Sequence, residues 1–121
     1  ITSYFLLLTA SMFMLAFGWF DNLGYFNINH PEIVTAGQTA DKLLPANAKG
    51  IAPYMGDTAF LYQTNRPGWP IGGDIKTKIK LGATHYVTTT FDDEAQQLIK
   101  ACSVISQTDQ YAIIDLQSCR P

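Results

Sequence analysis

Charge is the scarcest property of this sequence. Only 15% of its 121 residues are Asp, Glu, Lys or Arg, against roughly 25% in an average soluble domain. The formal net charge is −2 and no run of basic residues occurs, which argues against a nucleic-acid-binding surface. The length suits one domain of ordinary size.

Cysteine is also scarce. Cys102 and Cys119 are the only two, too few for a disulfide scaffold, and neither has metal-ligand spacing to His30 or His85. Whether they pair is left open, since an oxidising compartment would permit a disulfide. A C-terminal hairpin, however, sets Cys102 opposite about Asp115, so that Cys119 overshoots. This geometry favours unpaired cysteines.

The few charges are unevenly distributed. Residues 1–20 carry none, and every Lys or Arg lies at position 42 or later. About twenty helical residues span about 30 Å, the hydrocarbon thickness of a bilayer, and helical Ser and Thr can bond back to the chain. The segment therefore predicts a transmembrane helix. Its aromatic belt is expected to consist of Trp19, Phe20, Tyr25 and Phe26.

Two other interpretations of this segment stay open. A signal-type segment needs a basic start and a cleavage site, and neither is visible in residues 1–20. A soluble core helix is the other alternative, but the uncharged run is long for one.

The flank that follows indicates the orientation of the helix. Residues 21–41 hold three acidic residues but no Lys or Arg, whereas cytoplasmic flanks are enriched in basic residues. We expect a connector over residues 21–30, and over 31–121 a domain on the periplasmic or external side of the cell's inner membrane. The chain starts at Ile1 and not at Met, which suggests a piece of a longer protein or a processed one.

Helices and strands alternate in the remaining sequence. Residue Asn29 or His30 precedes Pro31, a favourable first helical residue. Helices are predicted at 31–44, 59–64, 75–81 and 94–101, and strands at 49–55, 69–71, 84–90, 103–106 and 111–116. The predicted helix caps are Asp57 or Thr58, Asp74 and Asp92. This alternation predicts an α/β domain with a small three-layer-type sheet, mostly parallel, with a C-terminal antiparallel hairpin at its edge.

The most distinctive stretch runs from residue 56 to residue 70. Asp57 follows a strand, and ligands bind at the carboxyl ends of strands in α/β sheets. Arg66 and Trp69 can hold an anionic or sugar-like group by fork hydrogen bonds and stacking, with Tyr62 in the same segment. The structural alternative is commoner: Asp57 is a helix cap, Arg66 pairs with a local carbonyl, and Trp69 covers the core.

Three further patterns have simpler explanations. Residues 72–74 (Gly-Gly-Asp) lack the other glycines and the lysine of a phosphate loop. Residues 92–94 (Asp-Asp-Glu) have oxygens for a divalent cation, but the helix dipole already favours an acidic first turn. His85 has no Ser, Cys or carboxylate at a telling distance and is interpreted as a surface or satisfied histidine. We therefore expect no catalytic residue and no metal ligand here.

The order of the motifs resembles a known family. The segments that carry the resemblance follow the apolar helix and comprise residues 43–48 (LLPANA), 56–58 (GDT), 61–69 (LYQTNRPGW), 81–87 (LGATHYV) and 111–116 (YAIIDL). They are similar to the C-terminal end of bacterial multi-spanning glycosyltransferases of the GT-C fold, the dolichyl-phosphate-mannose–protein mannosyltransferase-like family. In that family the last membrane helix leads into a small periplasmic α/β domain, so the resemblance implies that residues 1–20 are the last span of a longer protein.

The resemblance implies that the parent enzyme moves a sugar from a polyprenyl-phosphate donor to an acceptor outside the cytoplasm. The family's catalytic carboxylate lies in the first external loop, which this chain lacks, so no catalytic residue is carried over. The implied role is non-catalytic: contact with membrane lipid, and docking of the acceptor or the lipid-linked donor. No cofactor is expected in this segment, and any divalent metal would belong to the parent.

The resemblance also predicts that Arg66→Ala in the full-length protein lowers transfer activity and leaves the fold intact. A second hypothesis is a self-standing single-span protein whose outer α/β domain binds a ligand or a partner protein. The length of the full gene discriminates between the two.

Overall fold

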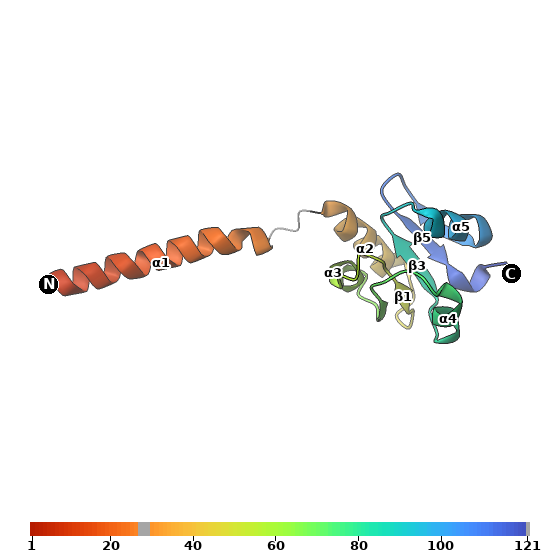
Figure 1. Ribbon diagram of the computed structural model, residues 1–121, viewed down its shortest axis with the longest axis horizontal. Helices are drawn as coiled ribbons and strands as arrows, with labels where there is room; N and C mark the ends of the chain where they lie inside the picture. The colour runs from red at the N-terminus through yellow and green to blue at the C-terminus, as the bar shows by residue number, and fades with distance from the viewer. Residues whose placement is uncertain (27–29, 121) are drawn as a thin grey trace. The chain divides into compact units, whose positions relative to one another are not determined.

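The computed structural model describes residues 1–26 and 30–120. The chain forms two compact units, residues 1–30 and residues 31–121. The described part of the first unit is one long helix, and the second unit is an α/β domain (Figure 1).

The helix α1 (Thr2–Phe26) contains the uncharged segment. The helical stretch of residues 2–24 is long and apolar enough to cross a membrane. Its most apolar part has no buried residue. The hydroxyl of Thr9 donates to the carbonyl of Phe5, so this polar group is satisfied within the helix, as expected for a hydroxyl in lipid.

The helix α1 extends beyond the predicted span into the predicted connector. Residues 21–26 are helical, and the side-chain amide of Asn22 donates to the carbonyl of Gly18 over 2.7 Å. The polar side chain of Asn22 is therefore satisfied by the helix itself. The predicted cap Asn29 lies outside the described residues, as do the side chains of the two last aromatic residues of the predicted belt, Tyr25 and Phe26.

The second unit has the predicted alternation of helices and strands. Its elements, in chain order, are α2 (Pro31–Leu43), β1 (Gly50–Ile51), α3 (Ala59–Gln63), β2 (Gly68–Trp69), α4 (Ile75–Lys80), β3 (His85–Thr88), α5 (Asp93–Ala101), β4 (Ser103–Gln107), β5 (Ala112–Asp115) and the 3₁₀ helix η1 (Leu116–Ser118).

The five strands form one mixed sheet in the order β2-β1-β3-β5-β4. The strand β1 pairs in parallel with β2 and β3, and β5 pairs antiparallel with β3 and β4. The predicted C-terminal hairpin is present, with β4 at the edge and β5 inside the sheet. This order follows from burial: residues 112–114 of β5 are buried, whereas β4 alternates exposed and half-buried residues.

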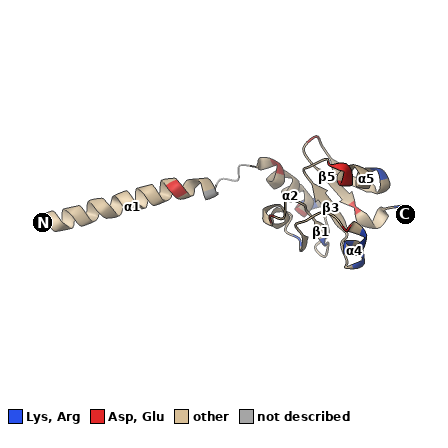
Figure 2. Cartoon of the chain, in the orientation of Figure 1, with Lys and Arg blue, Asp and Glu red and all other residues tan. Residues whose placement is uncertain are grey.

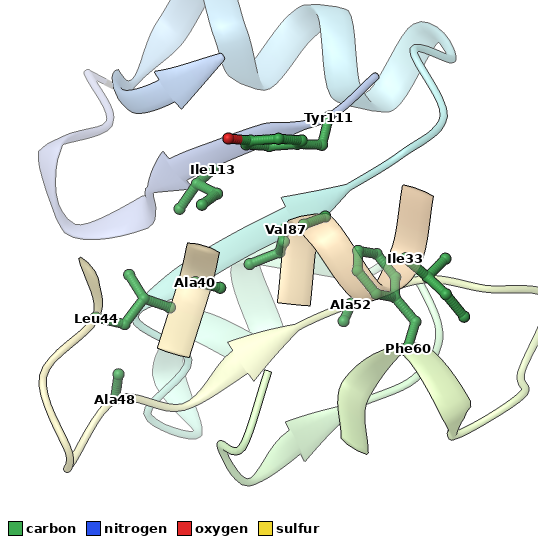
Figure 3. Close-up of a cluster of buried hydrophobic side chains, with 10 residues drawn as sticks. Ile33, Ala40, Leu44, Ala48, Ala52, Phe60, Val87, Tyr111 and Ile113 are labelled. Carbon is green, nitrogen blue, oxygen red and sulfur yellow. The ribbon is translucent and has the colours of Figure 1, made fainter. Parts of the chain in front are cut away.

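Side chains that alternate along the strands supply two cores, one on each face of the sheet. Val87 and Ile113 belong to the core under α2 and α3 (Figure 3). Their neighbours Tyr86 and Ile114 belong to the core under α4 and α5. Successive strand residues point to opposite faces, so the domain has the predicted three layers, with helices on both sides of the sheet.

The helices α2 and α3 approach closely at a glycine. A Cβ atom added to Gly37 would lie 2.3 Å from the Cβ of Gln63 and 2.6 Å from its carbonyl carbon. Gly37 lowers the intrinsic helix propensity of α2. Its position shows why a glycine occurs there: any side chain would push α3 away from the core.

The two cysteines form a disulfide, with Cα atoms 3.9 Å apart, so the expectation of unpaired cysteines was wrong. The predicted hairpin register was close, since Ser103 pairs with Asp115. The prediction that Cys119 lies too far along the chain to reach Cys102 assumed that β5 continues straight. Instead η1 turns the chain back after β5 and returns Cys119 to Cys102.

Two predicted helix caps differ in outcome. The Asp92 carboxylate accepts a hydrogen bond from the backbone N–H of Ala95 over 2.9 Å and caps α5 as predicted. Asp74 precedes α4 as predicted but makes no side-chain cap bond. Its backbone is left-handed, with φ of 46°, whereas a capping side chain normally extends from β-region backbone.

We expect Gly37→Ala to lower the free energy of unfolding of the α/β domain by about 1–3 kcal/mol, the usual cost of overpacking. Thermal unfolding of the whole chain in detergent, followed by near-ultraviolet circular dichroism, measures the effect. Gly18→Ala in α1 is the matched control, because nothing lies within 4 Å of its added Cβ. Equal stability of the two variants would contradict the close approach of α2 and α3.

Candidate functional site

The segment from residue 56 to residue 70 begins with a helix cap. The Asp57 carboxylate accepts a hydrogen bond from the backbone N–H of Ala59 over 2.8 Å, and Thr58 makes no side-chain cap bond. Asp57 is exposed and lies beyond the carboxyl end of β1. The structural alternative for Asp57 is therefore confirmed, and its ligand-binding role stays a prediction.

The guanidinium of Arg66 closes the C-terminal end of α2. Its Nε donates to the Pro45 carbonyl over 2.9 Å, and its Nη1 donates to the Asp41 carboxylate over 2.7 Å. The remaining bonds go to the backbone carbonyls of Asn65, Asp41 and Leu44 at 2.8, 3.0 and 2.7 Å. A guanidinium has five N–H donors, and all are engaged.

These bonds confirm the structural alternative for Arg66, whose side chain is only 9% exposed. A cation at the end of α2 also complements the helix dipole. The expectation that Arg66→Ala leaves the fold intact does not fit this geometry. Ligand binding by Arg66 stays a prediction, and it requires some of these bonds to be exchanged for bonds to the ligand.

An open hollow of about 640 Å³ adjoins Arg66. Tyr62 belongs to it, and the Tyr62 side chain is 81% exposed. Its lining comes from α2, α3 and the loop before β2, and comprises Asp41, Thr58, Leu61, Tyr62, Gln63, Asn65, Arg66 and Pro67. Tyr62 and Arg66 are thus brought together, whereas Asp57 and Trp69 do not line this hollow.

The indole of Trp69 packs on the other side of the sheet. It is half-buried against the core under α4 and α5, which confirms the interpretation that it covers the core. Arg66 contacts α2 on the opposite side. The structure therefore separates the two residues that the sequence predicts to hold one ligand together.

The topology creates a second candidate site. The parallel strands β1 and β3 are neighbours, and the chain leaves them toward opposite faces of the sheet. The helix α3 after β1 packs on one core, and α5 after β3 packs on the other. Such a switch point opens a crevice at the carboxyl ends of the two strands, where α/β proteins bind ligands.

A hollow of about 240 Å³ lies at this point, and we call it the switch-point hollow. Residues that follow β1 line one side, and the end of β3 with its following loop lines the other. The lining comprises Pro53, Tyr54, Met55, Thr88, Thr90 and Asp92.

The walls of the switch-point hollow are held in place. The ring of Tyr54 meets the ring of Phe60 edge-on, with centroids 6.4 Å apart. The Thr88 hydroxyl donates to the Thr90 carbonyl over 2.8 Å and accepts from the Thr90 N–H over 3.0 Å. Met55 has a left-handed backbone, with φ of 50°, a conformation that is enriched near functional sites.

The loop of residues 71–73, which lies next to Pro53 of the switch-point hollow, is held by charged side chains. The Glu94 carboxylate accepts bonds from the Gly73 N–H at 2.8 Å and from the Tyr86 hydroxyl at 3.0 Å. Burial and the nearby charge of Glu94 raise the pKa of Tyr86 far above its usual range. The Lys78 ammonium donates to three carbonyls of the same loop, at 2.6, 2.9 and 2.8 Å.

These contacts also explain why residues 72–74 do not form a phosphate-binding loop. The Gly73 N–H that would face a phosphate is taken by a carboxylate. The first turn of α5 adds Asp93 and Glu94 beside it, and Figure 2 shows this acidic start of α5. An anion would be repelled there, so the structure agrees with the rejection of this motif.

His85 is a satisfied histidine, in agreement with one of its two interpretations, and it is not at the surface. It is 8% exposed, and its Nδ1 lies 2.8 Å from the Thr84 hydroxyl. Burial lowers the pKa of His85, and the charge of Asp115 offsets part of this effect. Among the residues that the structure describes, no group of three or more His, Cys, Asp or Glu could hold a metal ion.

Apart from Asp92, the residues of the switch-point hollow belong to no motif that the sequence alone indicates as functional. Both strands that lead to them are predicted, but the pattern does not indicate that these strands are neighbours. Only the strand order brings the two loops together. Comparison with known proteins adds no candidate: no protein-family model, curated protein or solved structure matches the chain.

We expect Arg66→Ala to lower the free energy of unfolding by about 2–4 kcal/mol, because three carbonyls at the end of α2 and one carboxylate lose a charged donor. Asp41→Asn is the matched partner variant. Its carboxylate is 42% exposed, and a partly exposed pair is worth about 1 kcal/mol or less.

Thermal unfolding in detergent measures both variants. A loss for Arg66→Ala no larger than for Asp41→Asn would show that the backbone bonds of Arg66 do not stabilise the domain. That result would return Arg66 to the ligand-binding hypothesis.

Proposed function

We propose that this chain is the membrane-anchored, extracytoplasmic C-terminal domain of a glycosyltransferase that transfers a sugar from a polyprenyl-phosphate donor to an acceptor. The domain carries no catalytic group and binds the acceptor or the donor. The motif order across residues 43–116 supports the link to the GT-C enzymes. The single observation that carries the cellular placement is a disulfide-closed domain joined to a helix of membrane length.

The character of α1 supports an anchor over a soluble core helix. A core helix buries at least one face, whereas the large apolar side chains of α1 are exposed. Those of Phe5, Leu8, Phe13 and Leu15 are between 64% and 75% exposed. Lipid is the solvent that suits such a surface.

The disulfide supports the extracytoplasmic side. Disulfides persist in secreted and periplasmic proteins and are rare in the reducing cytosol. Cys102 and Cys119 are the chain's only cysteines, and both are used. The absence of Lys and Arg from residues 21–41 points the same way.

A binding role suits the chemistry of the domain. Three of the charged groups are engaged in structural bonds: Arg66 and Lys78 donate to carbonyls, and Glu94 accepts from a tyrosine and a backbone N–H. A nucleophile–base pair needs a side chain poised at hydrogen-bond reach from its base. The Thr84 hydroxyl lies 2.8 Å from Nδ1 of His85, but it is engaged with the backbone of Lys49, since it donates to the carbonyl over 3.2 Å and accepts from the N–H over 3.0 Å. What the domain offers instead is two hollows.

One observation favours the second candidate, a single-span tethered binding domain. The switch-point hollow is built wholly from residues 53–92 of this chain, so ligand binding there requires no other part of a larger protein. The two candidates share the anchor and the outer domain, and they differ in what precedes α1.

The complete reading frame upstream of Ile1 tests the proposal. We expect it to encode many further apolar spans and an acidic residue in the first external loop. Membranes that contain the full-length protein are then expected to transfer sugar from a polyprenyl-phosphate-linked donor, and loss of that acidic residue is expected to abolish transfer. A reading frame with a single span would refute the glycosyltransferase and leave the tethered binding domain.

A further inference from the structure

We propose that the switch-point hollow binds a single neutral, hydroxyl-rich ring of the saccharide class. The ring stacks on Tyr54 and donates hydroxyl hydrogen bonds to Asp92. This binding depends on the hollow alone. The identification of this ring with the sugar acceptor rests on the proposed function.

The size of the hollow limits the ligand to one ring. Its volume is about 240 Å³, below the roughly 300–1,000 Å³ of pockets that enclose drug-sized molecules. A lipid-linked donor or a folded peptide is too large for it. A monosaccharide, or the terminal ring of a longer glycan that enters from the mouth, is of suitable size.

The charge around the hollow favours a neutral ligand. Its six lining residues include one carboxylate, Asp92, and no Lys or Arg. The nearby loops add Asp57 and Glu94, while the Lys78 ammonium is committed to three carbonyls. A phosphate group would meet the negative charge of Asp92 with no Lys or Arg in the lining to attract it, which disfavours the phosphate of the polyprenyl donor.

The lining chemistry matches a ring with an apolar face and hydroxyl edges. The aromatic ring of Tyr54 offers a flat apolar surface, fixed by its edge-on contact with Phe60. The Asp92 carboxylate uses one oxygen, Oδ1, for the cap of α5. A carboxylate has about four acceptor positions, so it can accept sugar hydroxyls without losing that cap.

The backbone of the hollow is preformed. The Tyr54 N–H donates to the Pro70 carbonyl over 3.3 Å, and the Tyr54 carbonyl accepts from the Asp57 N–H over 2.8 Å. Met55, next to it, has a fully exposed side chain at the mouth. A flexible thioether can pack over rings of differing shape, so Met55 is placed to cover the bound ring.

The larger hollow beside Tyr62 is the weaker candidate for such a ligand. Its only guanidinium, that of Arg66, has its five donors engaged. Tyr62 stands out into solvent at 81% exposure, without an aromatic partner among the described ring contacts. Tyr62 therefore serves as the control residue for Tyr54.

The test is a nuclear magnetic resonance titration of the whole ¹⁵N-labelled chain in phosphocholine micelles, which carry no sugar headgroup. The probes are the methyl glycosides of mannose, galactose and glucose, with inorganic phosphate as the charged comparison. We expect at least one glycoside to shift the amides of residues 54–57 and 88–94 saturably, with Kd on the order of 1–10 mM. Phosphate is expected to shift none of them.

Two variants and one control locate the site. Tyr54→Leu keeps apolar bulk but loses the flat ring, and we expect it to weaken glycoside binding at least tenfold. Asp92→Asn retains a capping side chain and is expected to weaken binding severalfold. Tyr62→Leu is expected to change nothing. The amide spectrum of each variant reports whether the domain is still folded.

Three results would overturn the inference: no saturable shift with any glycoside, equal loss from Tyr62→Leu and Tyr54→Leu, or tighter binding of phosphate at the same amides. The proposed function fails separately. Glycoside binding at Tyr54 in a protein whose reading frame encodes one span sustains the inference and refutes the glycosyltransferase. A multi-span transferase whose domain binds none of the glycosides sustains the proposed function and refutes the inference.

Discussion

Burial of the central strands on both faces is the constraint on which the rest of the domain depends. Tyr86–Val87 and Ile113–Ile114 are pairs of neighbouring residues in these strands. In each pair, one side chain packs in the core under α2 and α3, and the other packs in the core under α4 and α5. Strands of this kind have no face for water, so helices must cover both sides. Because α3 and α5 then leave neighbouring parallel strands in opposite directions, the switch-point hollow follows from the same constraint.

Three of the scarce charged residues fasten chain segments to one another. Arg66 donates to carbonyls at the end of α2, Lys78 donates to the carbonyls of residues 71–73, and Glu94 joins that loop to Tyr86. The disulfide does the same for the turn after β5. A domain with short strands relies on such links, since its two-residue strands β1 and β2 have few ladder hydrogen bonds of their own.

Local structure was predictable from this sequence, and long-range neighbours were not. Apolar periodicity, Pro31 and Asp92 locate helices because caps and amphipathic faces are local properties. The place of β5 between β3 and β4, the return of Cys119 and the five bonds of Arg66 depend on segments far apart in the chain. For the same reason, the sequence does not show that Arg66 and Trp69 lie on opposite sides of the sheet. Only three positions separate them in the chain, so they were predicted to form one site.

Thiol labelling in spheroplasts of a bacterial host that express the full-length protein tests most directly whether the domain is disulfide-closed and outside the cytoplasm. A membrane-impermeant maleimide is expected to label Cys102 and Cys119 only after treatment with an impermeant reductant, and without permeabilisation of the membrane. Labelling without any reductant would contradict the disulfide. Labelling only after permeabilisation would place the domain in the cytoplasm and contradict the orientation on which the proposed function depends.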